Sequence, residues 1–299
     1  MITSLHQRTA AHGQPAFAIR ECCEALSLSR SGYYGHVAKA QRPRHQADAV
    51  LAAQIETHFA ASRQTYGSRR VRHSLRRQGY CHSRRRVARL MRQQQLRARQ
   101  KGRFRPRTTD SRHAGPIAPN LLKEAPAPTR PNQVWVSDVT YLETTEGWRY
   151  LSATLDLCTR KVLAWTVADT LATTLCTSTL QQALEKERPH THTLIHHSDR
   201  GAQYASHEFR HQLALSQLTP SMSRAGNCYD NAAMESFWAT FKSDCLPPRS
   251  RPTPAQLELL TFDYIETFYN PLRLHSSLGY QSPLDYERSL LHSPPTTKN

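Results

Sequence analysis

The chain has 299 residues and a formal net charge of +17, and it contains no run approaching 18 apolar residues, so we expect no membrane-spanning segment. The positive charge is concentrated at one end. Residues 1–120 contain 24 Lys and Arg against 5 Asp and Glu, whereas residues 121–299 contain 16 against 18. This asymmetry indicates a polyanionic partner for the N-terminal part.

The sequence shows neither a targeting signal nor a metal-binding cysteine pattern. The first residues lack the apolar core of a signal peptide, and the 7 cysteines include no CxxC pair. We therefore expect reduced thiols and no structural zinc site, in a protein of the cytoplasm that is associated with the nucleoid. Nucleic acid is a better partner than a membrane surface, because the Arg-rich segments carry no opposite face of Trp or Leu.

Residues 1–105 are predicted to form a basic, all-α region. Apolar residues at helical spacing predict helices within 17–37 and over 49–62, 67–79 and 82–96. The last two flank a turn at Gly79, and Ser83 can cap the second of them. Two short helices around a tight turn are typical of a helix-turn-helix, whose second helix enters the major groove.

The arginines of these two helices are the predicted DNA contacts, and they are Arg69, Arg70, Arg84, Arg85 and Arg86. The alternative is a solvated basic face on a small helical bundle. Even in that case, contact with phosphates is the expected use of so many arginines.

Residues 106–131 contain six prolines and little apolar periodicity, which predicts a stiff linker. The near-neutral part that follows alternates between strand and helix patterns. Strands are predicted at 132–143, 148–157, 161–169, 191–198 and 218–223, and helices at 171–187, 206–217 and within 227–246. The first three strands have short connections and predict an antiparallel meander. The whole order predicts a mixed α/β sheet flanked by helices. Trp135, Trp165 and Trp238 are assigned to its core. His197 is expected to be packed or solvent-facing, with support of a metal ligand as the alternative.

Three acidic residues of this part could share one crevice. Asp138 interrupts the first strand, and Asp199 ends the fourth in "HHSDRGAQY". These two strands are expected to be neighbours, and ligands bind where such strands end. Glu235 lies on the last helix, in "AAMESFW", and Lys242 shares its face two turns on. Each acid also has a structural interpretation. Asp199 fits a turn residue and Glu235 fits a solvent-facing helix residue. For Asp138 the structural and the functional interpretations are equally good.

The spacing of these acids carries a family resemblance. Sixty residues separate Asp138 from Asp199, 35 separate Asp199 from Glu235, and Lys242 follows. Together with "NQVWVSDVTYL", "YLSATLDLCTRKVLAW", "SRAGNCYDNAAMESFWATFKSD" and "FYNPLRLHSSLGYQSPLDY", this resembles the DDE set of retroviral integrases and of insertion-sequence transposases of the second-reading-frame (OrfB) type. The resemblance covers about 17–96 and 132–286. Ala202 stands where a serine is usual.

The resemblance implies a ribonuclease-H-like core at 132–290, with three antiparallel and two parallel strands and a C-terminal helical extension, followed by a tail at 291–299. It implies that Asp138, Asp199 and Glu235 are catalytic and hold two Mg²⁺ or Mn²⁺ ions for phosphoryl transfer, as hard oxygen ligands do. Lys242 would position DNA, and Arg273 of "YNPLRLH" is a further candidate DNA contact, with a packed turn as its alternative.

The implied activity is cleavage of one strand at an element end and transfer of the 3′-OH, followed by a circular intermediate and insertion into target DNA. The expected partners are element-end and target DNA, a homo-oligomer on DNA and the product of the upstream reading frame, with no membrane and no small-molecule substrate. Two alternatives stay open: a catalytically silent DNA-binding regulator, and a ribonuclease-H-like nuclease that only hydrolyses.

Overall fold

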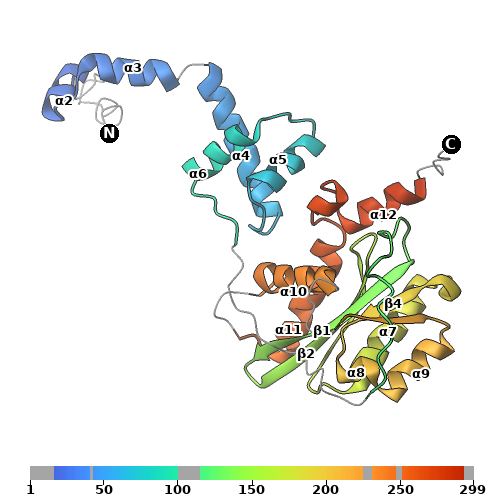
Figure 1. The fold of residues 1–299 in the computed structure, drawn as a ribbon. Helices are drawn as coiled ribbons and strands as arrows, with labels where there is room; N and C mark the ends of the chain where they lie inside the picture. Colours follow the sequence, from blue (N-terminus) through green and yellow to red (C-terminus); the bar gives the residue numbers. More distant parts are fainter. Residues whose placement is uncertain (1–16, 41–42, 100–114, 225–230, 247–250, 293–299) are drawn as a thin grey trace, which may run out of the picture.

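The computed structural model describes residues 17–40, 43–99, 115–224, 231–246 and 251–292. A helical N-terminal region is joined to a sheet flanked by helices (Figure 1). No helix within these ranges has both the length and the apolar character needed to cross a bilayer. The calls for residues 1–16 and for the tail after 292 lie outside the described residues.

The N-terminal region is helical throughout its described part, as predicted. Its helices are α2 (Ile19–Ala25), α3 (Arg30–Ala40), α4 (Pro43–Ala61), α5 (Ser68–Arg77) and α6 (Arg84–Gln93). The α5–α6 turn contains Gly79 at φ +89°, a conformation that favours glycine. Ser83 caps α6, since its hydroxyl accepts the backbone N–H of Arg86 at 3.3 Å.

Helices α4, α5 and α6 pack into a three-helix unit around buried aliphatic side chains, while α2 and α3 extend away from it (Figure 1). An ion pair also links α4 to α6. The Asp48 carboxylate accepts Nε of Arg86 at 2.7 Å and Nη2 of Arg89 at 2.6 Å. Partial burial raises the pKa of Asp48, but the two arginines outweigh it, so the net pKa is lowered.

The sheet has five strands in the order β3-β2-β1-β4-β5. They are β1 (Val134–Thr144), β2 (Gly147–Asp156), β3 (Val162–Ala168), β4 (Ile195–Ser198) and β5 (Thr219–Met222). The pairs β1–β2 and β2–β3 are antiparallel, and β1–β4 and β4–β5 are parallel. This confirms the predicted meander and the predicted pairing of the first and fourth strands. The fourth strand begins later than predicted, because Thr191–Thr193 forms a 3₁₀ turn, η1.

Helices cover both faces of the sheet (Figure 1). One face carries α7 (Thr173–Glu187), α8 (Ala202–Ala205) and α9 (His207–Leu215), and the other carries α10 (Ala232–Asp244) and α11 (Pro254–Phe262). Successive side chains of a strand point to opposite faces of the sheet. Trp135 therefore belongs to the core under α7, α8 and α9, and Val136 to the core under α10 and α11. The predicted interior position of Trp135 is confirmed, and it is fully buried.

A C-terminal extension follows α11 and consists of η3 (Asp263–Tyr269, a short π-helix), η4 (Ser276–Leu278) and α12 (Pro283–His292). It is tied to edge strand β3 by Asn270. That amide accepts the N–H of Val162 and donates to its carbonyl, both at 2.9 Å, as a neighbouring strand would. Lys161 contacts Glu187 at 3.0 Å and Glu287 at 3.1 Å, which joins α12 to the sheet domain.

Part of the predicted linker packs against the sheet domain. Residues 106–114 lie outside the described residues. Beyond them, the backbone N–H of Leu121 donates to Ser221 Oγ at 3.0 Å, and that of Met222 donates to the carbonyl of Pro119 at 3.4 Å. This segment therefore runs along β5, the other edge strand of the sheet.

Two buried histidines predict a stability that falls in acid. Burial lowers the pKa of His196 and of His275 to about 3, from an unfolded value near 6.5. Below pH 6.5 only the unfolded chain gains these protons, so the free energy of unfolding falls by about 1.4 kcal/mol per pH unit for each histidine. This contribution is flat above pH 7.

Urea unfolding at pH 7.5, 6.5 and 5.5 measures this pH dependence of the free energy of unfolding. H275Q should flatten the slope, whereas H207Q, at an exposed site, should leave it unchanged. Equal slopes in all three proteins would contradict the assignment.

Candidate active site

Two of the predicted acids lie next to each other across neighbouring strands. The parallel register of β1 and β4 ends with the pair Ser137 and Ser198. Asp138 and Asp199 come directly after this pair in the two chain segments. They therefore lie side by side, at the roughly 4.8 Å spacing of neighbouring strands. There β4 ends while β1 continues to Thr144, paired only with β2. Asp138 is mid-strand in sequence and yet lies where its neighbouring strand ends.

The Asp138 carboxylate is held at both oxygens. Oδ1 accepts the backbone N–H of Val139 at 2.9 Å, and Oδ2 accepts Nε1 of Trp238 at 3.0 Å. The pKa of Asp138 is nevertheless well above its usual range, first because of burial and next because of the Asp199 charge, with a smaller contribution from Glu235. The three predicted acids therefore form one electrostatic cluster.

Helix α10 brings the third acid to this cluster. Glu235 lies in its first turn and is exposed, and Trp238 is three residues further on the same face. Because Trp238 donates to Asp138, it fixes this face of α10 over β1. Lys242, two turns after Glu235, is half-buried; burial lowers its pKa and the Asp138 charge opposes that shift. The charges of Lys242 and Asp138 thus interact, whereas a DNA contact by Lys242 stays a prediction.

Asp199 is oriented by the turn that follows it. Its Oδ1 accepts the backbone N–H of Gly201 at 2.9 Å. A Cβ at position 201 would lie 3.0 Å from that same oxygen, so glycine permits the close approach. His197 is buried, with Nδ1 2.8 Å from Ser221 Oγ and Nε2 3.1 Å from Ser223 Oγ, which confirms that it is packed.

The site has the donor chemistry of a divalent-cation site. Three carboxylates supply hard oxygen ligands, and their mutual repulsion is what a bound cation relieves. One turn before Glu235, the buried Oδ1 of Asn231 accepts no hydrogen bond within the described structure. Over the same residues, no three acidic, His or Cys side chains converge closely enough to count as a preformed metal cluster.

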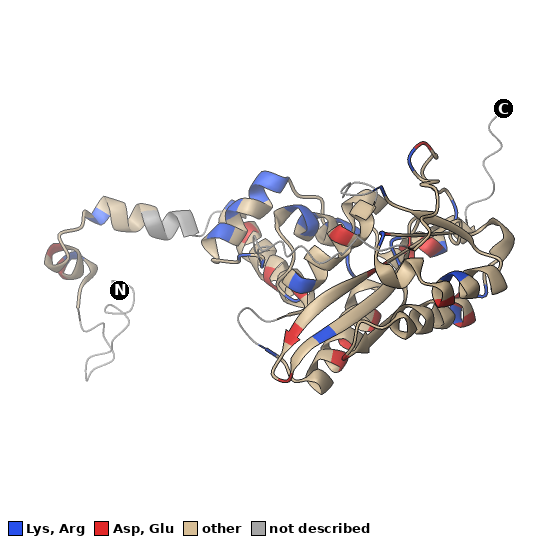
Figure 2. Cartoon of the chain, turned by 60° about the horizontal axis from the view of Figure 1, so that its bottom comes forward, with Lys and Arg blue, Asp and Glu red and all other residues tan. Residues whose placement is uncertain are grey.

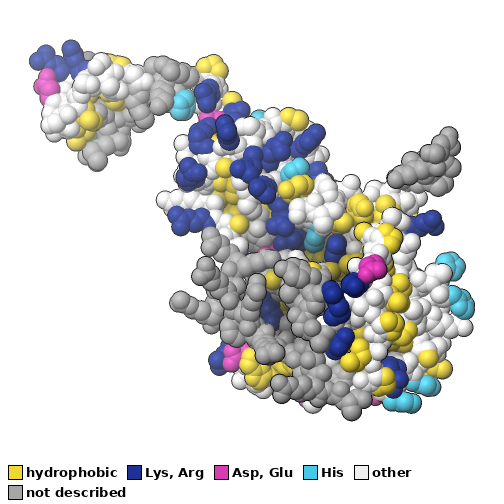
Figure 3. Space-filling view, viewed as in Figure 1, with side chains coloured by type: hydrophobic (Ala, Val, Ile, Leu, Met, Phe, Trp, Pro, Cys, Tyr) yellow, Lys and Arg dark blue, Asp and Glu magenta, His cyan; other side chains and the backbone are white. Residues whose placement is uncertain are grey.

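The predicted DNA contacts divide into two groups. Arg69, Arg84 and Arg85 are exposed on α5 and α6. Arg86 pairs with Asp48, as described above. The Arg-rich helices therefore present only part of their charge to a ligand. Lys and Arg are frequent along these helices (Figure 2), and many of their side chains lie on the surface seen in Figure 3.

The other predicted contacts require correction. Arg273 is 4% exposed, and its Nε donates to Asp244 Oδ2 at 2.8 Å, so the alternative of a packed turn is right. A guanidinium buried in an ion pair cannot reach a phosphate. Arg70 is half-buried, and its Nε donates to the carbonyl of Leu274 at 2.9 Å.

Trp238 is a site residue that sequence reasoning assigned only to the core. Its indole ring is buried, and its N–H nevertheless reaches the carboxylate. The available signal was its spacing of three residues from Glu235, which places both on one helix face.

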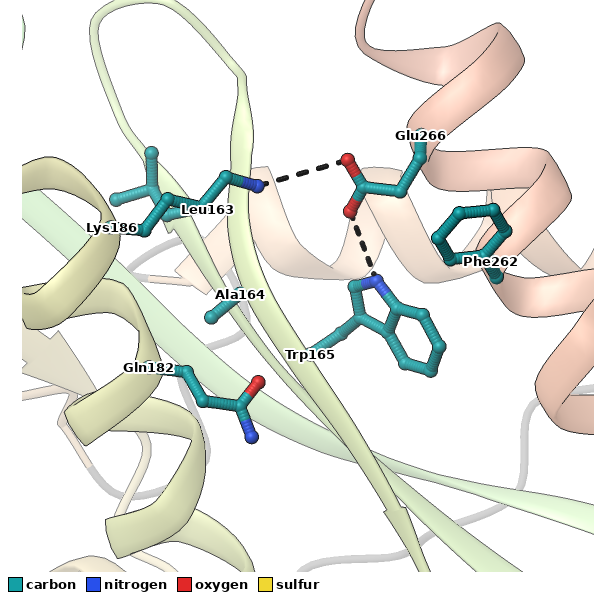
Figure 4. Close-up of a pocket in the computed structure, with 7 residues that line it drawn as sticks. All are labelled: Leu163, Ala164, Trp165, Gln182, Lys186, Phe262 and Glu266. Atoms are coloured by element: carbon teal, nitrogen blue, oxygen red, sulfur yellow. Dashed lines mark hydrogen bonds and ion pairs between the residues drawn. The ribbon is translucent and has the colours of Figure 1, made fainter.

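Trp165 lies only partly in the core, contrary to the prediction. It lines a pocket at β3, away from the three acids (Figure 4). Its Nε1 donates to Glu266 Oε1 at 3.2 Å, and Glu266 Oε2 lies 3.7 Å from Lys186 Nζ. The acid of this pocket is thus already paired.

Comparisons with known proteins show what this chain resembles. Two models described as "Integrase core domain" match residues 128–228 and 216–283, and an "HTH-like domain" model matches 45–104. Solved structures with a resembling fold include the HTLV-2 integrase catalytic core domain in complex with magnesium, at 18% identity and a TM-score of 0.38, over 55% of this chain and 98% of that one.

Curated relatives match over most of their length. The chain is 43% identical to "Insertion element IS600 uncharacterized 31 kDa protein" of Shigella sonnei, over 87% of this chain and 95% of that protein. It is 36% identical to "Transposase InsF for insertion sequence IS3A" of Escherichia coli (strain K12), over 93% and 96%. The chain therefore belongs to the insertion-sequence transposases with an integrase core domain, which are polynucleotidyl transferases.

Proposed function

We propose that Asp138, Asp199 and Glu235 are the catalytic acids with which this transposase cuts a strand at the end of its insertion sequence and joins the new 3′-OH to target DNA. The observation that carries this proposal is the adjacency of Asp138 and Asp199 where β4 leaves β1, with α10 held over them by Trp238. The pKa of Asp138 is raised first by burial and then by the neighbouring acids, and a carboxylate in such surroundings supports a site that takes up a cation.

The three carboxylates would hold two Mg²⁺ or Mn²⁺ ions. When bound, such ions activate the attacking oxygen and stabilise the leaving oxygen of an in-line displacement. The hydrogen bond from Trp238 occupies one oxygen of Asp138 and so fixes the direction in which the other oxygen can bind a ligand. Gly201 does the same for Asp199.

Two displacements would follow one another at this site. In the first, the water oxygen bonds to the phosphorus at the element end and the 3′ oxygen leaves with a proton. In the second, that 3′-OH attacks a target phosphodiester, and a target 3′ oxygen leaves. Lys242 would bind a phosphate of the DNA beside the acids, since its ammonium lies within electrostatic reach of Asp138.

DNA would also contact the helix-turn-helix through Arg69, Arg84 and Arg85, which are exposed. Joining two ends of one element requires at least two active sites, which favours a homo-oligomer on DNA. The product of the upstream reading frame is a further proposed partner.

An assay with a labelled element-end duplex, a target plasmid and Mg²⁺ tests the function. We expect both a nicked end and a labelled plasmid, and neither product in EDTA. Cleavage without joining would instead favour a hydrolytic nuclease, and binding alone would favour a regulator.

A further inference from the structure

Helix α5 has three faces, and only one of them is apolar. At 100° per residue, Val71 and Leu75 share the buried face. Arg70, His73 and Arg77 form a second stripe, and Arg69, Arg72 and Arg76 form a third. The two polar stripes lie on different sides of the helix, and the structure uses them differently.

The second stripe contacts the C-terminal extension of the catalytic domain at every position. Arg70 donates to the carbonyl of Leu274, as described above. The His73 ring stacks on Tyr280, with 3.6 Å between centroids and 6° between planes. Arg77 forms an ion pair with Asp285, at the start of α12.

The segment that precedes α5 extends this contact. Arg63 donates from both terminal nitrogens to the Asp263 carboxylate, at 2.6 and 3.1 Å, and its guanidinium lies 4.9 Å from the centre of the Phe268 ring. The buried hydroxyl of Tyr66 accepts the backbone N–H of Leu274 at 2.7 Å and donates to the carbonyl of Leu272 at 3.2 Å. We call Arg63, Tyr66, Arg70, His73 and Arg77 the docking face.

The third stripe is left for DNA. Arg69 and Arg76 are exposed, and Arg72 braces the α5–α6 turn through the carbonyl of His82 at 3.0 Å. Lys and Arg side chains gather over α4–α6 in the space-filling view (Figure 3). The docking face contains specific, paired contacts, whereas the third stripe presents guanidinium groups to solvent.

Resting on the proposed function, we propose that the docking face fixes the helix-turn-helix to the catalytic domain, and so sets the distance between the DNA it binds and the phosphate that is cut. The contacts span more than 200 residues of sequence, so the linker does not have to determine this distance. The docking residues are positioning residues: none of them contacts the three acids in the described structure. An end sequence bound on α6 would thus be held at a fixed separation from Asp138 and Asp199.

The test compares two double variants that remove the same charge from the same region. R63A/R77A removes both ion pairs of the docking face, and R69A/R76A removes two arginines of the third stripe. Spin labels at Cys81, which is exposed, and at an introduced E208C on α9 report the distance between the two parts, in a C228S background. Fluorescence anisotropy reports affinity for element-end DNA, and sequencing of cut ends reports where the strand is cut.

We expect R63A/R77A to broaden the spin-label distances, to bind DNA within threefold of the unmodified chain, and to cut at several positions. We expect R69A/R76A to keep narrow distances and a single cut position, and to lower the slope of log affinity against log salt by about 2. The charge swap R77D/D285R should restore narrow distances relative to R77D alone, which guards against simple misfolding.

Unchanged distances in R63A/R77A would overturn the docking. Broadened distances with a single cut position would overturn its role in setting the distance to the cut. If the unmodified chain cuts no DNA, the proposed function fails, while the distance measurements still decide the docking.

Discussion

Replacing Asp199 with asparagine is expected to abolish strand joining while leaving DNA affinity within about twofold. The substitution keeps the shape of the side chain and removes the negative charge beside Asp138, so the site loses a ligand that a divalent cation requires. A loss of at least a thousandfold in rate is expected, as for other groups on which transition-state stabilisation depends. The arginines proposed to bind DNA belong to another part of the molecule. Joining is measured with labelled end DNA and a target plasmid, and affinity by anisotropy.

D169N is the matched control, because Asp169 is exposed beyond the end of β3 and lies outside the cluster of three acids. It should join DNA at the rate of the unmodified chain. Full joining by D199N would remove Asp199 from the mechanism. Equal loss of DNA binding in D199N would indicate a folding defect instead, which circular dichroism would reveal.

Replacing Arg273 with alanine is expected to destabilise the protein by about 3–5 kcal/mol, the cost of removing one partner from a buried ion pair. Asp244 is 7% exposed, and among the described side chains its carboxylate would keep the hydrogen bond from the Tyr264 hydroxyl, 3.3 Å from Oδ2. Asp244 ends α10, the helix that carries Glu235, so we also expect weaker placement of the third acid. Urea unfolding by tryptophan fluorescence measures the loss.

R288A provides the comparison, because Arg288 is exposed and lies 3.8 Å from Asp285; it should cost less than about 1 kcal/mol. The double variant R273A/D244A should recover part of the stability lost in R273A, since no buried charge is then left unpaired. An R273A protein as stable as R288A would show that the pair contributes little.

Local pattern predicted much of this protein. Alternating β-branched and aromatic residues with short turns predicted the meander, and apolar spacing with Ser83 predicted the helix-turn-helix. Both rest on interactions between residues near in sequence, which is why they can be derived from it. The spacing of Asp138, Asp199 and Glu235, read as a family resemblance, also pointed to the three acids, and the fold places two of them, Asp138 and Asp199, on neighbouring strands where β4 ends.

The ion-pair partners of individual arginines, which lie far apart in sequence, could not be predicted. Arg86 and Arg273 look like their exposed neighbours in the sequence, yet they form ion pairs with Asp48 and Asp244. Trp238 looks like any core aromatic until α10 lies over β1. By itself, then, the sequence determined the excess of positive charge and most of the elements, and it pointed to the three acids as candidates. The tertiary structure alone decided which arginines remain exposed to DNA, because a charge that is buried must find its partner in space.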